Sequence, residues 1–68
     1  MKLIGKHPSG RAIIIRLNNQ EYHYETANSF GSATSLTRAK TEARADSFTS
    51  SEMDQGLHIG NWHWKEFG

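Results

Sequence analysis

The sequence contains no cysteine and only one proline. The absence of cysteine excludes disulfides, thiolate chemistry and zinc–sulfur sites, and it fits a protein of a reducing compartment. At 68 residues the chain is long enough for one small domain, and so small a domain buries little surface and has marginal stability. Such chains often need a metal, disulfides, self-association or a partner to become robust.

Long apolar runs are also absent. The apolar pair Leu3-Ile4 is followed at once by Gly5 and Lys6, so the chain has no apolar core of a signal peptide. No stretch approaches the length of a membrane span. We therefore expect a cytoplasmic protein, located in the host-cell cytosol if the gene is viral.

The chain has no strong excess of either charge. Eight Lys and Arg residues face seven Asp and Glu residues, a net charge of +1. A protein that binds nucleic acid mainly through phosphates usually carries a larger positive excess. The apolar fraction is low, 35%, so the fold depends on where these residues cluster.

The clearest cluster of apolar residues lies in a predicted hairpin, with strands 12–17 and 20–25 and with Asn18 and Asn19 at the turn. This register pairs Leu17 with Gln20, Ile15 with Tyr22 and Ile13 with Tyr24 on one face, and Arg16 with Glu21, Ile14 with His23 and Ala12 with Glu25 on the other. The first face is apolar and the second mostly charged, as in a sheet covered on one side. A slip by one residue would invert both faces, so the register is well specified.

A first strand over residues 2–6 and a turn over residues 7–10 precede this hairpin, which makes a three-stranded meander. Pro8 presets φ for the second turn position. Residues 26–33 form a connector of small and polar residues, in which we expect Phe30 alone to pack inward.

A helix is predicted over residues 35–47, capped by Ser35 or Thr34. Its buried face has helical spacing and consists of Leu36, Ala39, Ala43 and Ser47. Arg38 and Glu42 can pair on the opposite face at i,i+4. Because the buried face is mostly alanine, we expect the helix to lie close to the sheet.

A polar loop over residues 49–56 leads to a last predicted strand over residues 57–67. Strict alternation places Leu57 and Ile59 on one face of this strand and Trp62 and Trp64 on the other, which is the open face of the sheet. A β-bulge at Gly60-Asn61 would bring both tryptophans to the buried face. A tight turn at the same position is the third alternative.

These elements predict a single small α+β domain over residues 1–68, with an antiparallel-rich sheet in the order strand–strand–strand–helix–strand and one helix on one face. Enzyme activity is not expected, because the carboxylates are spread over every element and no glycine-rich loop has phosphate-binding spacing. The four histidines are His7, His23, His58 and His63, and none has HxxxH or HExxH spacing. We therefore expect no catalytic residues, no metal site and no cofactor.

Two binding functions remain. The first is protein binding, since aromatic and arginine side chains are enriched at interface hot spots. The residues predicted to contact the partner are Ile14, Arg16, Glu21, His23, Trp62, Trp64 and Lys65. An exposed strand edge would add pairing with a partner strand, or with a second copy to form a homodimer.

The alternative is a single-strand nucleic-acid-binding module, in which sheet aromatics stack on bases while Lys and Arg meet phosphates. The candidates are Tyr22, Tyr24, Trp62 and Trp64 with Lys6, Arg11, Arg16 and Lys65. Against this alternative, the tyrosines are needed for the core, and Glu21, Glu25 and Glu66 share the surface.

The hairpin over residues 12–25, the helix segment 35–43 and the final strand 57–67, compressed into a short cysteine-free chain, resemble small phage-encoded inhibitors. Anti-CRISPR proteins and phage inhibitors of host RNA polymerase include members with this layout. The resemblance covers most of the chain as layout and includes no diagnostic motif, so it transfers no functional residue. It implies a cytosolic, cofactor-free protein that blocks a host protein or ribonucleoprotein complex.

Overall fold

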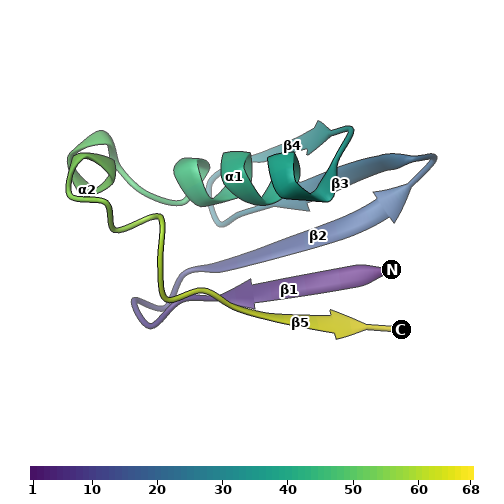
Figure 1. Cartoon of the computed structure of the whole chain (residues 1–68), viewed down its shortest axis with the longest axis horizontal. Helices are drawn as coiled ribbons and strands as arrows, with labels where there is room; N and C mark the ends of the chain where they lie inside the picture. The colour runs from purple at the N-terminus through teal and green to yellow at the C-terminus, as the bar shows by residue number, and fades with distance from the viewer.

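The computed structural model describes residues 1–68 and contains one five-stranded sheet and two helices (Figure 1). The elements are β1 (Lys2–Lys6), β2 (Ala12–Asn18), β3 (Glu21–Glu25), β4 (Phe30–Ala33), α1 (Leu36–Asp46), α2 (Ser50–Asp54) and β5 (His63–Phe67). The strand order is β4-β3-β2-β1-β5, and every neighbouring pair is antiparallel. The predicted α+β class is confirmed, with one strand and one helix more than expected.

The β2–β3 hairpin forms with the predicted faces but not with the predicted partners. Asn19 and Gln20 have positive φ, 52° and 66°, and occupy the turn, so Leu17 lies opposite Tyr22 and Ile15 opposite Tyr24. The predicted register is therefore wrong by two positions. Because side chains alternate with a period of two, this shift leaves every side chain on its predicted face.

The helix predicted over residues 35–47 is confirmed as α1 with its two caps. The Ser35 hydroxyl caps it by accepting from the Arg38 backbone N–H, and Ser47 is the C-cap. Ala39 and Ala43 are fully buried, so the helix approaches the sheet closely. The predicted Arg38–Glu42 ion pair is also present, with Nε and Oε2 3.4 Å apart.

Strand β4 replaces most of the predicted connector. It pairs with β3 so that Gly31 lies opposite Tyr24 and Phe30 opposite Glu25. This pairing turns Phe30 away from the core, and the residue is 86% exposed, so the prediction that it packs inward is wrong. Gly31 is required here, because a Cβ atom would come within 2.5 Å of the Tyr24 hydroxyl.

The segment after α1 differs most from expectation. Residues 49–56 contain the short helix α2, whose N-terminus carries a capping box between Thr49 and Glu52. The predicted strand over 57–67 is too long: residues 57–60 form a turn and bend, and Asn61 has a φ of 67°. Trp62 and Trp64 pack on the helix side, with no bulge inside a strand, and the turn lies at residues 55–59 rather than at the predicted Gly60-Asn61.

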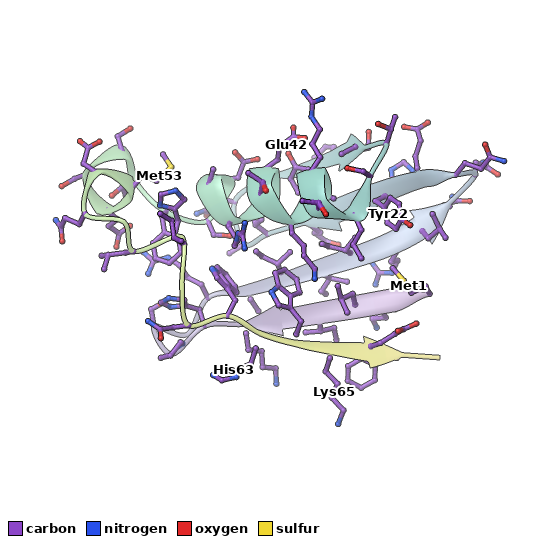
Figure 2. The ribbon with its side chains drawn as sticks, viewed as in Figure 1. Met1, Tyr22, Glu42, Met53, His63 and Lys65 are labelled. Atoms are coloured by element: carbon purple, nitrogen blue, oxygen red, sulfur yellow. The ribbon has the colours of Figure 1, made fainter.

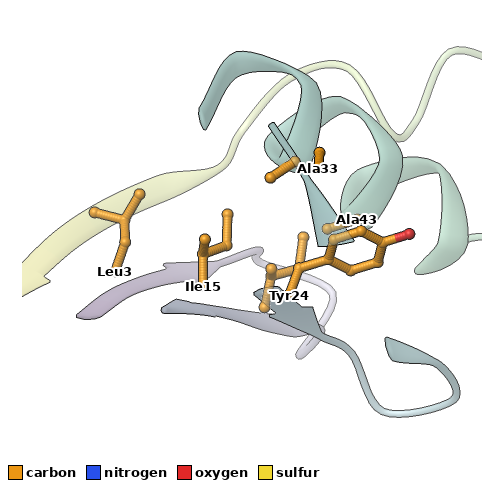
Figure 3. Packing of buried hydrophobic residues seen from close by; sticks show 7 residues of the cluster. Leu3, Ile15, Tyr24, Ala33 and Ala43 are labelled. Atoms are coloured by element: carbon orange, nitrogen blue, oxygen red, sulfur yellow. The ribbon is translucent and has the colours of Figure 1, made fainter. Parts of the chain in front are cut away.

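The core lies between α1 and the sheet (Figure 3). Its buried members are Leu3, Ile13, Ile15, Tyr24, Ala33, Ala39 and Ala43. The helix contacts β2, β3 and β4, while the half-buried Trp62 and Trp64 pack against the remainder of the core. Leu17 was expected in the core but is 42% exposed, because it lies near the hairpin tip beyond the reach of α1.

Candidate binding surface

The face of the sheet opposite α1, called the open face below, has no helix over it (Figure 1). Residues opposite each other in paired strands point to the same side, so the register defines rows across this face. The rows are Phe30–Glu25–Ile14–Ile4–Lys65, Ser32–His23–Arg16–Lys2–Phe67 and Ala12–Lys6–His63. Five residues of the predicted protein-binding site share the open face, namely Ile14, Arg16, Glu21, His23 and Lys65.

Apolar side chains run through the middle of the open face to both edges. Ile4 and Ile14 are half-buried and lie opposite each other on β1 and β2. Phe30 on β4 is 86% exposed and Phe67 on β5 is 42% exposed. These two rings contribute nothing to the core, so their apolar surface is available to a partner.

The charges of the open face are unevenly distributed. Glu21 and Glu25 both lie on β3, and Glu25 pairs with Arg16 at 3.6 Å. Both partners of that pair are more than half exposed, so it contributes about 0–1 kcal/mol. Strands β1 and β5 carry Lys2, Lys6, His63 and Lys65 on this face, and none of them forms an ion pair. This half of the open face is positive.

The two tryptophans of the predicted site lie on the other side of the sheet. Their rings stack with centroids 5.9 Å apart, and the Lys40 ammonium lies 4.8 Å from the Trp64 ring. The Trp62 indole donates a 3.1 Å hydrogen bond to the His58 carbonyl. The structure therefore separates Trp62 and Trp64 from the open-face residues with which they were grouped.

Phe48, at the end of α1, joins these rings into an aromatic cluster. The His7 ring lies 5.1 Å from both Phe48 and Trp62, and the Arg11 guanidinium lies 4.2 Å over Phe48. This cluster connects the β1–β2 turn, the end of α1 and the segment before β5. Its role is to hold the C-terminal segment against the sheet.

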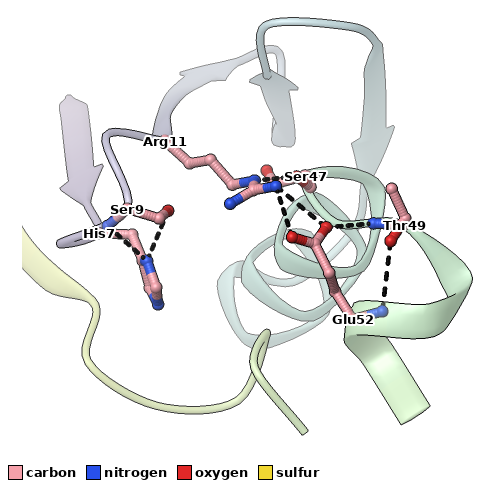
Figure 4. Close-up of polar contacts among 6 residues, drawn as sticks. All are labelled: His7, Ser9, Arg11, Ser47, Thr49 and Glu52. Atoms are coloured by element: carbon pink, nitrogen blue, oxygen red, sulfur yellow. Dashed lines mark hydrogen bonds and ion pairs between the residues drawn. The ribbon is translucent and has the colours of Figure 1, made fainter. Parts of the chain in front are cut away.

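Arg11 fastens α2 to the same end of the sheet (Figure 4). Its guanidinium donates to the Ser47 carbonyl at 2.7 Å and to both Glu52 carboxylate oxygens at 3.0 and 2.9 Å. The backbone N–H of Thr49 donates to the same carboxylate and, with a smaller effect from Arg11, lowers the pKa of Glu52. Arg11 is thus engaged inside the fold, although it was a candidate phosphate contact.

Tyr24 is likewise engaged on the helix side. Its hydroxyl donates to the Asp46 carboxylate at 3.1 Å. Burial, together with this negatively charged acceptor, raises the pKa of Tyr24. Tyr22 is half-buried on the same side, so neither tyrosine reaches the open face.

The four histidines lie in separate places. His23 and His63 lie on different strands of the open face, while His7 and His58 lie near the aromatic cluster. The structure contains no group of three His, Asp or Glu side chains arranged to hold a metal ion. No helix has the length and apolar character needed to cross a membrane.

No protein-family model, curated protein or solved structure matches this chain.

Several open-face residues were missed from sequence. Lys2 and Ile4 were not assigned to a face, Phe30 was expected in the core and Phe67 was not considered for binding. The sequence does contain a signal for β1. If β1 and β2 pair across the turn at residues 7–11, Ile4 lies opposite Ile14 and therefore points to the same face. No local pattern predicts that Phe30 lies in a strand.

Proposed function

We propose that the protein is a non-enzymatic binding protein that contacts a partner protein through the open face of its sheet. The observation that supports this proposal best is the composition of that face. Half-buried isoleucines lie at its centre, exposed Phe30 and Phe67 lie at its edges, and the lysines of β1 and β5 have no carboxylate partner. Aromatic residues are enriched at protein interfaces, and the rim around the apolar centre of such an interface is polar.

For the partner, we propose a bacterial defence complex of the CRISPR-Cas type or a transcription complex, with this chain as a phage-encoded inhibitor. The small cysteine-free α+β layout and its resemblance to phage inhibitors support this choice. Inhibition would be stoichiometric, since it acts by occupying a surface.

A pull-down from bacterial lysate tests the binding function. Wild-type protein and the exposed helix variant Thr37→Glu should recover the same stoichiometric protein, while Arg16→Glu and Ile14→Glu should lose it. Far-UV circular dichroism must first show that each variant is folded. Recovery of no stoichiometric partner, or equal recovery by all variants, would contradict the proposal.

The target class is tested separately. Purified protein should reduce either transcription by host RNA polymerase in vitro or interference by a CRISPR-Cas complex in cells. Absence of an effect in both assays would exclude these targets and leave the binding function to be judged by the pull-down.

Single-strand nucleic-acid binding is the second candidate, favoured by the lysines and phenylalanines of the open face. The positions of the aromatic side chains argue against nucleic-acid binding. All tyrosines and tryptophans lie on the helix side, and Phe30 and Phe67 lie on opposite edge strands, about 19 Å apart at the usual strand spacing. A gel shift at low salt tests this alternative, and absence of binding there would eliminate it.

A further inference from the structure

Strand β5 presents an unpaired edge, and the hydrogen-bond ladder shows which backbone groups it offers. Leu17 N–H donates to the Met1 carbonyl and His7 N–H to the Arg11 carbonyl, so odd-numbered residues of β1 bond to β2. Antiparallel ladders alternate, and the even-numbered residues of β1 therefore bond to β5, through the partners His63, Lys65 and Phe67. Trp64 and Glu66 consequently direct their N–H and C=O groups outward, where no strand follows.

The open-face side of this edge is cationic. Lys6 lies opposite His63, and Lys65 lies opposite Ile4 on the neighbouring strand. A hollow of about 320 Å³ at this position is lined by Ile4, Lys6, His63, Trp64, Lys65 and Phe67. No carboxylate shares this side: Glu66 alternates to the helix side, and His63 and Lys65 point away from α1 (Figure 2).

The helix side of the same edge carries the Trp64 ring and, two residues further along, Glu66. The Trp64 ring is half-buried and packs against the core, with the Lys40 ammonium 4.8 Å from it. A strand added to β5 would therefore have cations beside its open-face residues and an indole ring beside the residue on the other side.

We propose that the β5 edge accepts an extended, acidic segment of the partner protein as a sixth strand. Carboxylates of that segment would face His63 and Lys65, an apolar side chain would lie beside Trp64, and its backbone would bond to Trp64 and Glu66. This inference rests on the proposed binding function and specifies the chemistry of the partner.

Charge complementarity favours this occupant over a second copy of the chain. If β5 paired with itself in antiparallel fashion, Lys65 would lie opposite Lys65 of the other copy when Trp64 pairs with Glu66, and Glu66 would lie opposite Glu66 in the register shifted by two residues. Like charges directly opposite each other destabilise strand pairing. A nucleic acid could meet the lysines but has no peptide groups to complete the ladder.

Amide exchange measured by NMR tests the proposal directly. The probe is a short capped peptide of alternating glutamate and valine; its controls are the lysine–valine counterpart, the same acidic peptide with N-methylated amides, and oligothymidylate. We expect only the first peptide to slow exchange of the Trp64 and Glu66 amides. Lys65→Gln and Lys6→Gln should each weaken its binding about two- to fivefold, the range of one exposed ion pair, whereas Arg38→Gln on α1 should not.

Several results would overturn the inference. These are unchanged exchange at Trp64 and Glu66, equal protection by the N-methylated or lysine peptide, or tighter binding of oligothymidylate. The partner recovered by pull-down separates this failure from failure of the proposed function. If that partner is lost with Arg16→Glu but binds Lys65→Gln and Lys6→Gln with the affinity of the wild type, the open face binds but the β5 edge is not the site.

Discussion

Substitution of Gly5 by alanine should destabilise the protein measurably, because the Trp64 ring lies against this glycine. Gly5 and Trp64 are opposite each other in the β1–β5 pair, and a Cβ atom at Gly5 would come within 2.5–2.8 Å of three ring carbons. The ring cannot move aside freely. Trp62 stacks against it at 5.9 Å, and Lys40 lies 4.8 Å from its centre.

The magnitude follows from two opposing terms. An extra methyl group in a packed site costs about 1–3 kcal/mol. Loss of glycine reduces the conformational entropy of the unfolded chain and offsets about 0.4–1 kcal/mol of that cost. We expect a net loss of about 1–2 kcal/mol, which in a domain of this size lowers Tm by about 5–15 °C.

Urea denaturation followed by tryptophan fluorescence measures this loss, and near-UV circular dichroism reports the Trp62–Trp64 stack. Gly60→Ala is the matched control, because a Cβ atom there meets nothing within 4 Å and the residue does not have positive φ. The control should be neutral or slightly stabilising. If Gly5→Ala were as stable as the wild type, or kept an unchanged near-UV spectrum, the close contact between strand and ring would be refuted.

Three further predictions concern the core, the α2 attachment and self-association. Ala39→Leu, at a fully buried position, should lower the free energy of unfolding by about 1–3 kcal/mol in urea denaturation. The control Thr37→Leu, at an exposed position, should change it by less than about 0.5 kcal/mol. Equal effects of the two variants would contradict the close helix–sheet packing. The lowered pKa of Glu52 favours its charged form in the folded state, so its stabilisation should be complete above its ordinary value of 4.5 and disappear as pH falls through the lowered folded value. Glu52→Gln should therefore flatten stability against pH over that window, and an unchanged acid profile would exclude the effect. The uncharged β4 edge should pair with a second copy to form a weak homodimer, which Ser32→Lys prevents; a constant monomer mass in sedimentation over a wide concentration range would exclude it.

Sequence reasoning succeeded where local chemistry determines the structure. The alanine-lined face and the Ser35 cap of α1 are encoded within a few residues, and both are confirmed. The capping box of α2 was equally readable, as Thr49 followed three residues later by Glu52, but the polar composition of the segment led to its assignment as a loop.

Sequence reasoning failed where distant partners determine the structure. Three of the four residues of β4 have little intrinsic β-propensity, and the strand pairs with β3 where Gly31 leaves room for the Tyr24 ring. The hairpin register depended on which two residues adopt positive φ, and Gln20 was not an obvious choice. The candidate surface was recovered in part, because alternation preserved the faces, whereas the placement of the tryptophans depended on the turn at residues 55–59 and on the positive φ of Asn61.

The position of β1 between β2 and β5 has a consequence for the order of folding. Of the five strands, β1 comes first in the sequence and β5 comes last, so β1 gains its outer neighbour only after the rest of the sheet has been synthesised. Closing that pair joins residues far apart in the sequence, such as Lys2 and Phe67, and such contacts are slow to form. During synthesis β1 is therefore a temporary edge strand, and the β5 edge is the last part of the sheet to form.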